Sequence, residues 1–320
     1  MRLLLVLLPV ALATTLGAQS PAERVLLDSM IAAPGGGSCS TGSPELKRLC
    51  TGFQQVGRAG QSGTAGDASR ARDAFERAVE EKPKWPMAWY GLGLSRVQAS
   101  RARMLAREGA LQPLGTSFEA GAGYALVRAL ELDSSYTPAA EALAMISIPR
   151  EGASRLTERI AMLRRLRATL SGRASFGAAQ VELVGGDPQS AVKYLLDALQ
   201  RHDIDSGTVL LSLSRAFHRA DRPSEGLDAL IRGSRDTTSA AQAAYHQELG
   251  LVASTNEMTE WDSLAVPARA EWLAAFWGTR DVKEARSEGD RLVEHYRRYE
   301  YAMKEYSLEL PRTGRHKVAR

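Results

Sequence analysis

The chain has few of the side chains from which catalytic and metal sites are built. Its 320 residues include 2 cysteines and 5 histidines. The histidines are His202, His218, His246, His295 and His316, and no two of them have the spacing that places metal ligands on one helix face. A Gly-x-Ser-x-Gly nucleophile motif is also absent. The sequence therefore predicts no catalytic residues, no metal and no cofactor, and it indicates a protein that is not an enzyme.

A strong charge of one sign is lacking as well. The formal net charge is +4, whereas nucleic-acid binding needs basic residues gathered on one face. Several arginines between Arg155 and Arg173 do accompany an apolar stripe of leucine and isoleucine. They form either the solvated face of a helix or a face that lies on an anionic membrane surface. The sequence predicts no nucleic-acid partner and leaves peripheral membrane association open.

A long apolar run occurs only at the start of the chain. Residues 3–16 are mostly apolar, follow the basic Arg2 and precede the small residues Gly17 and Ala18. This order is typical of a secretory signal peptide. The run is shorter than the ~20 residues that a membrane-spanning helix needs, which argues against an uncleaved anchor. We expect residues 1–18 to be a signal peptide and the mature chain to be exported.

The two cysteines agree with export. Cys39 and Cys50 lie in a stretch rich in glycine, serine and proline, and such a pair is expected to form a disulfide in an oxidising compartment. Free thiols are the alternative, while a metal site would need more ligands. We expect residues 19–66 to be a loop-rich segment, with a disulfide and one short helix near residues 44–55.

From Asp67 onward, small and apolar residues recur at helical spacing with almost no strand-like alternation. One pattern consists of a small residue, a bulky residue four positions later and a small residue three further. Its copies are Ala71, Phe75 and Ala78; Ala122, Leu126 and Ala129; Ala191, Leu195 and Ala198; a weak copy, Gly226, Leu230 and Gly233; and a degenerate copy with leucine at the small positions, Leu156, Ile160 and Leu163. After residue 122 the copies start 34 or 35 positions apart, and about 17 residues are inserted before it, within 101–120.

This pattern resembles the tetratricopeptide repeat, in which Pro83 would end one repeat and Trp89 and Gly93 would open the next. The resemblance covers roughly residues 67–255. It implies an all-α fold in which helix pairs form a right-handed superhelical stack, an α-solenoid, with a helical pair at the C-terminal end. It also implies a concave groove that binds a protein or peptide partner. The residues expected to line that groove are Met87, Tyr90, Leu94 and Val97.

Residues 256–308 carry two further motifs. The residues of the first are Trp272, Phe276, Trp277, Arg280 and Asp281, and those of the second are Tyr296, Arg297, Arg298 and Tyr301. The motifs resemble the start of the GWxTD-domain family of exported bacterial proteins, which implies a location in the periplasm or cell envelope. The β-rich portion that follows in that family is not recognisable here, so the segment is expected to be a truncated or degenerate form, followed by a polar tail, 309–320. We expect Arg280, Asp281, Arg297 and Arg298 to form an ionic cluster between two helices.

Three hypotheses about function follow. The leading one is an exported, non-catalytic protein-binding scaffold that uses the concave groove. The alternative is a structural subunit of a larger envelope or membrane complex, which docks through its aromatic C-terminal helices and should expose a large apolar patch at 261–301. The third is an accessory domain of an enzyme, which requires buried titratable groups that converge in one pocket.

Overall fold

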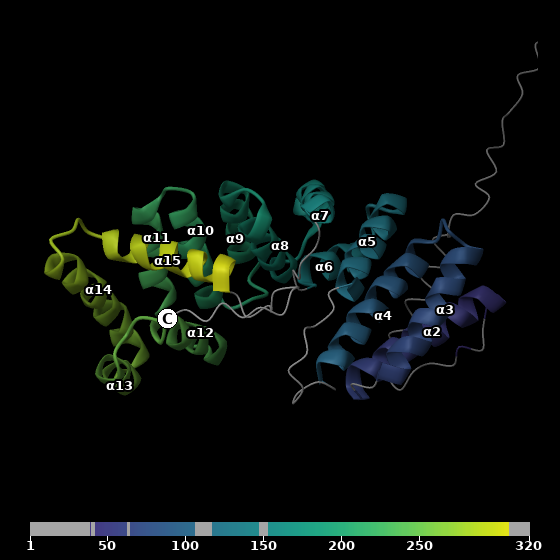
Figure 1. Cartoon of the computed structure of the whole chain (residues 1–320), viewed down its shortest axis with the longest axis horizontal. Helices are drawn as coiled ribbons and strands as arrows, with labels where there is room; N and C mark the ends of the chain where they lie inside the picture. The colour runs from purple at the N-terminus through teal and green to yellow at the C-terminus, as the bar shows by residue number, and fades with distance from the viewer. Residues whose placement is uncertain (1–38, 40–41, 63–64, 106–116, 147–152, 307–320) are drawn as a thin grey trace, which may run out of the picture.

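The computed structural model describes residues 39, 42–62, 65–105, 117–146 and 153–306, and every regular element in these ranges is helical (Figure 1). The predicted signal peptide (1–18) and polar tail (309–320) lie outside them. The α-helices are α2 (Pro44–Ser62), α3 (Ala65–Glu81), α4 (Pro86–Leu105), α5 (Ser117–Leu132), α6 (Thr137–Met145), α7 (Ala153–Leu166), α8 (Gly172–Gly185), α9 (Pro188–Arg201), α10 (Ser206–Arg219), α11 (Pro223–Gly233), α12 (Ser239–Leu249), α13 (Thr255–Ser263), α14 (Val266–Lys283) and α15 (Asp290–Tyr306). A short 3-10 helix, η1 (Arg167–Thr169), follows α7.

The helices pack mainly on their neighbours in chain order, and they run along the long axis of the molecule from α2 to α14 (Figure 1). The most extensive contacts join α2 with α3, α3 with α4, α4 with α5, α8 with α9, and α10 with α11. The five copies of the predicted pattern lie on alternate helices, α3, α5, α7, α9 and α11. The prediction of an all-α stack of helix pairs is therefore confirmed.

The bulky residue of the first copy shows why the pattern is needed. Phe75 in α3 is fully buried between two glycines, Gly52 in α2 and Gly91 in α4. A Cβ atom at Gly52 would lie 2.8 Å from the Phe75 ring, and one at Gly91 would overlap that ring. The two glycines allow the backbones of α2 and α4, the first helices of consecutive pairs, to approach one phenylalanine. Its ring fills the space among three helices.

The first helix pair begins earlier than predicted. The short helix expected near residues 44–55 extends to Ser62 as α2, so much of the expected loop-rich segment is helical. The physical reason is an apolar face, which includes Leu49, Phe53 and Val56 and continues to the buried Ala59. This face packs on α3 and α4, and tertiary packing stabilises the helix through its glycines. The disulfide between Cys39 and Cys50 is present, as predicted.

The insertion predicted within residues 101–120 lengthens a helix in part. Helix α4 extends to Leu105, so residues 101–105 of the predicted insertion belong to it. The rest of the insertion, residues 106–116, lies outside the described residues.

The aromatic residues of the C-terminal segment are turned inward. Trp261, Phe276, Trp277 and Tyr296 form one core with Tyr245 and with leucines from α10, α11 and α12. Across the described part of 261–301, the large hydrophobic side chains classed as exposed are Val282 and Tyr301. Most of the aromatic side chains of this segment therefore belong to the core. Within the described residues, no helix is long and apolar enough to cross a membrane.

Candidate functional site

The first helices of the pairs carry equivalent positions, which the packing between helices identifies. A Cβ atom at Gly93 in α4 would lie 3.4 Å from the carbonyl oxygen of Ala122 in α5. A Cβ atom at Gly226 in α11 would lie 3.1 Å from the carbonyl oxygen of Ser214 in α10. Gly93 and Ser214 therefore hold equivalent positions in their helix pairs. Each is a small residue of the first helix that faces the first residue of the pattern in the second helix, Ala122 or Gly226.

The repeat spacing of 35 residues extends this register from Ser214 to Ala179 in α8 and Ala144 in α6, both of which are buried. We define the A-face by counting from the equivalent positions Gly93, Ala144, Ala179 and Ser214. It consists of the residues three positions before each of them and one, four and five positions after. Among the described residues it comprises Tyr90, Leu94, Val97 and Gln98 on α4; Glu141 and Met145 on α6; Phe176, Gln180, Leu183 and Val184 on α8; and Leu211, Arg215, His218 and Arg219 on α10. Positions 148 and 149, which the same rule gives after α6, lie outside the described residues.

On α4 the A-face includes three of the four residues that the sequence placed in the groove. Tyr90, Leu94 and Val97 are half-buried and pack against the core with one side. Met87 is wholly buried, which corrects the expectation that it lines the groove. Its position near the start of α4 directs it into the core, where it cannot reach a partner.

On α6 and α8 the A-face carries accessible apolar side chains beside the polar Glu141 and Gln180. Met145 is 51% exposed and Val184 is 61% exposed, although both belong to residue types that are usually buried. Phe176 and Leu183 are half-buried beside them. Exposed methionine and aliphatic side chains on a rigid helical surface are typical of protein contact surfaces.

On α10 the A-face is covered by α15, which crosses in front of it in Figure 1. The Tyr296 hydroxyl lies 3.1 Å from the Ser214 hydroxyl, and the Tyr296 ring centroid lies 4.8 Å from that of His218. Glu248 from α12 forms an ion pair with Arg215 and lies 3.0 Å from His295 Nε2. Residues from three helices thus form a polar cluster under α15, which the sequence analysis did not predict.

Burial and neighbouring groups shift the pKa values of three side chains in this cluster. Burial opposes ionisation of Glu248, but the hydrogen bond from His295 and the charge of Arg215 lower the pKa of that carboxyl below its ordinary value. Burial lowers the pKa of His218, against the effect of its hydrogen bond to the Ser214 carbonyl oxygen. Burial also raises the pKa of Tyr296. The fold therefore favours the ionised form of Glu248 and the neutral form of His218.

The pKa of His218 gives the fold a dependence on pH. His218 Nδ1 lies 2.8 Å from the Ser214 carbonyl oxygen, and Nε2 finds no hydrogen-bond partner among the described residues. Below about 6.5, the ordinary value, the unfolded chain takes up a proton here that the folded chain does not. We therefore expect the free energy of unfolding to fall as the pH drops below that value, as urea titrations at several pH values would measure.

The matched variant for this prediction is His218→Phe, which keeps a ring beside Tyr296 but cannot be protonated. It should be less sensitive to pH than the wild type in the same window. Glu248, whose pKa is lowered, stabilises the fold above its ordinary value of about 4.5, and this stabilisation is lost at lower pH. Equal slopes for the two proteins near 6.5 would contradict the assignment to His218.

The ionic cluster expected at the C-terminal motifs does not form. Arg280 lies 2.8 Å from Glu257 of α13 and stacks on Phe276. Arg297 and Arg298 are exposed and pair with Glu294 of their own helix. Arg297 and Arg298 pair within α15 because residues three and four positions apart are neighbours on a helix surface.

Asp281 has a different role from the one expected. It is 3% exposed, and its carboxylate accepts hydrogen bonds from the backbone N–H groups of Gly289 at 2.8 Å and Arg291 at 2.7 Å. These groups lie at the start of α15, where backbone N–H groups lack partners within the helix. Asp281 therefore fixes the beginning of α15 to the end of α14 through backbone rather than through arginine.

The arginines in and next to the arginine-rich helix α7 do not all lie on a solvated face. Arg159 is 1% exposed and donates a hydrogen bond of 2.7 Å to the Ile146 carbonyl oxygen. Arg164 forms a two-pronged pair with Glu182 of α8, and the nearby Arg167 pairs in the same way with a carboxylate of α9. Arg164 and Arg167 thereby join consecutive helix pairs, since the carboxylates that they bind lie on α8 and α9.

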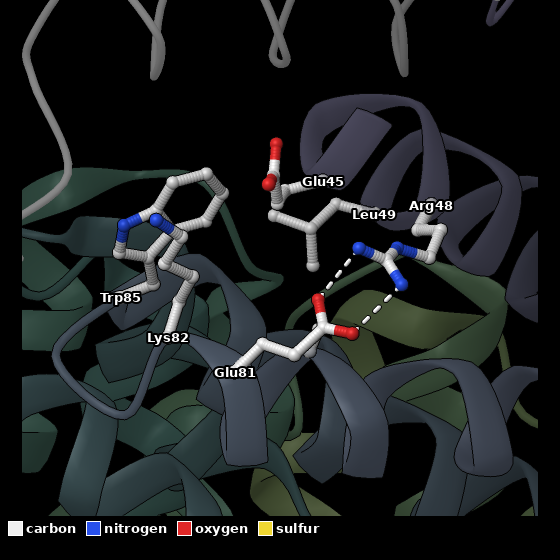
Figure 2. A pocket seen from close by; sticks show the side chains of 7 residues that line it. Glu45, Arg48, Leu49, Glu81, Lys82 and Trp85 are labelled. Carbon is white, nitrogen blue, oxygen red and sulfur yellow. Dashed lines mark hydrogen bonds and ion pairs between the residues drawn. The ribbon is translucent and has the colours of Figure 1, made fainter. Parts of the chain in front are cut away.

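A shallow hollow at the other end of the stack carries no convergent set of polar groups (Figure 2). It measures about 180 Å³ including space open to solvent, and it lies between α2, α3 and the turn after α3. The Arg48 guanidinium pairs with the Glu81 carboxylate at 2.6 Å, and Lys82 Nζ lies 5.8 Å from the ring centroid of Trp85. The charged groups of this hollow are largely paired with one another, so it does not define a ligand site.

The remaining tests of the site are negative. Among the residues that the structure describes, no three histidine, cysteine, aspartate or glutamate side chains are placed to hold a metal ion. No family model, no curated protein and no solved structure matches the chain. The A-face is therefore assigned from the geometry of this chain alone.

Proposed function

We propose that this protein is an exported, non-catalytic scaffold of the tetratricopeptide type that binds a segment of another protein on its A-face. One observation carries the proposal. The A-face presents one accessible apolar side chain on α6, Met145, and one on α8, Val184, in register with the half-buried Tyr90, Leu94 and Val97 of α4. A row of apolar side chains on successive rigid helices offers an extended contact surface.

Two further features support this type of protein. Phe75 packs between consecutive first helices, and Trp89 and Gly93 occupy the start of a first helix, as the tetratricopeptide resemblance implies. The disulfide between Cys39 and Cys50 is consistent with an oxidising compartment such as the periplasm or cell envelope. The resemblance of α14 and α15 to the GWxTD-domain family remains part of the proposal, with their aromatic residues serving as internal core.

The test is photo-crosslinking from single positions. A photoreactive amino acid replaces Val184 on the A-face of α8 or, as the matched control, Leu196 on α9, the second helix of the same pair, which is 42% exposed. We expect one partner from the envelope fraction to be crosslinked from position 184 and not from 196. The Val184→Asp variant should bind the purified partner at least about tenfold more weakly than wild type, while Leu196→Asp binds normally. Equal crosslinking or equal affinity from both positions would remove the A-face from consideration.

A further inference from the structure

Helix α15 is bound through the same register positions that the A-face uses elsewhere. Arg215 in α10 corresponds to Leu94 in α4, and its guanidinium carbon lies 4.8 Å from the ring centroid of Tyr299. His218 corresponds to Val97 and contacts Tyr296. Arg219, one position further, pairs with Glu300 at 3.1 Å. The A-face of α10 thus already holds a helix, and that helix belongs to the chain itself.

The contact has the form of a bound amphipathic helix. Leu292 and Tyr296, four positions apart on α15, are buried in the core that α15 shares with α10, α12 and α14. On its other side, Arg297 and Arg298 have side chains that are 74% and 67% exposed. A narrow stripe of α15 therefore makes the contact, in the way that a ligand helix binds a groove by residues one turn apart.

The surface of α10 on which α15 lies is also more polar than a protein core. Arg215 and His218 are half-buried, and the Arg219–Glu300 pair has side chains that are 31% and 43% exposed. Burial raises the pKa of Glu300, and the charge of Arg219 only partly offsets this effect. Arg219 also donates a hydrogen bond to the Leu183 carbonyl oxygen of α8. The surface that α15 covers is therefore continuous with the uncovered A-face of α8.

We infer that the A-face of α10, together with Glu248 of α12, is a helix-binding site that α15 occupies in cis. The partner that fits it is a helix carrying a tyrosine and a glutamate one turn apart, as Tyr296 and Glu300 are. The tyrosine would contact His218 and Ser214, and the glutamate would pair with Arg219. This inference rests on the proposed function, because it identifies the class of segment that the A-face binds.

The test uses a fluorescein-labelled synthetic peptide of residues 288–306 and the full mature chain, with binding read by fluorescence anisotropy. In the Tyr299→Ala, Glu300→Ala chain, α15 is held less firmly while α10 is unchanged. We expect this chain to bind the peptide at least about tenfold more tightly than wild type, because a site that is free more often has a higher apparent affinity. A peptide with Tyr296→Ala and Glu300→Ala should not bind.

A second experiment holds α15 on α10 by a covalent crosslink, so that the peptide cannot reach the site. In the Arg219→Cys, Glu300→Cys chain, a short bismaleimide joins α15 to α10, and the same chain before crosslinking is its control. Crosslinking should abolish peptide binding, and far-UV circular dichroism checks that both forms are folded. Absence of binding to every chain, or equal binding to crosslinked and uncrosslinked chains, would overturn the inference. Crosslinking of a partner from position 184 does not depend on α15, so it separates failure here from failure of the proposed scaffold function.

Discussion

Replacing Trp277 by alanine is expected to lower the free energy of unfolding by about 3–5 kcal/mol. The side chain is 4% exposed, packs edge-to-face on Phe276 with ring centroids 5.2 Å apart, and contacts His295 of α15. Its loss leaves a cavity among α12, α14 and α15, which the surrounding rigid helices can close only in part. Urea denaturation of the mature chain, followed by circular dichroism, measures the effect.

Tyr301→Ala is the matched control, because Tyr301 belongs to the same family-like motifs but is 59% exposed. We expect it to change the free energy of unfolding by less than about 0.5 kcal/mol. Similar losses for both variants would show that the C-terminal aromatic residues do not divide into core and surface as described. Such a result would also reopen the hypothesis that these helices dock into a larger complex.

Removal of the Glu248 carboxylate should have the second largest effect. Glu248→Ala leaves the Arg215 cation without its carboxylate, and Arg215 retains only 28% side-chain exposure. Breaking a buried pair from one side costs more than the pair itself contributes, so we expect a loss of about 3 kcal/mol. The measurement is the same urea titration at neutral pH, where Glu248 is ionised.

The double variant Arg215→Ala, Glu248→Ala provides the internal control. It removes both charges, so it should be less destabilised than the sum of the two single variants. Glu225→Ala breaks the exposed pair with Arg222 and is expected to have no measurable effect. Strict additivity of the two single losses would mean that Arg215 and Glu248 do not stabilise each other in the folded chain.

The sequence predicted the fold well where the evidence is local. The spacing of Ala71, Phe75 and Ala78 reports packing within and between adjacent helices, and the structure places each copy of this pattern on a second helix. Helix α2 was predicted too short because its glycines indicate a loop when taken alone. The apolar face from Leu49 to Ala59 decides its extent, and that face has meaning only against α3 and α4.

The candidate site was predicted less completely, because its members are distant in the chain. Ser214, Glu248 and Tyr296 come from three helices separated by more than 30 residues, so no motif links them. The repeat register did contain a signal. It places Arg215 and His218 at the positions of Leu94 and Val97, yet only the structure shows that α15 covers them. Similarly, Arg297 and Arg298 look like partners for Asp281 in sequence, but Asp281 binds backbone.

The link between α14 and α15 has a consequence for any competing segment. Only residues 284–289 separate the two helices, and Asp281 holds the start of α15 in place. A ligand on so short a tether is present at an effective concentration on the order of millimolar. A free helix of equal intrinsic affinity therefore displaces α15 only at comparable concentrations. A partner that also contacts Val184 and Met145 gains a second attachment, so this tether selects for long partners over short ones.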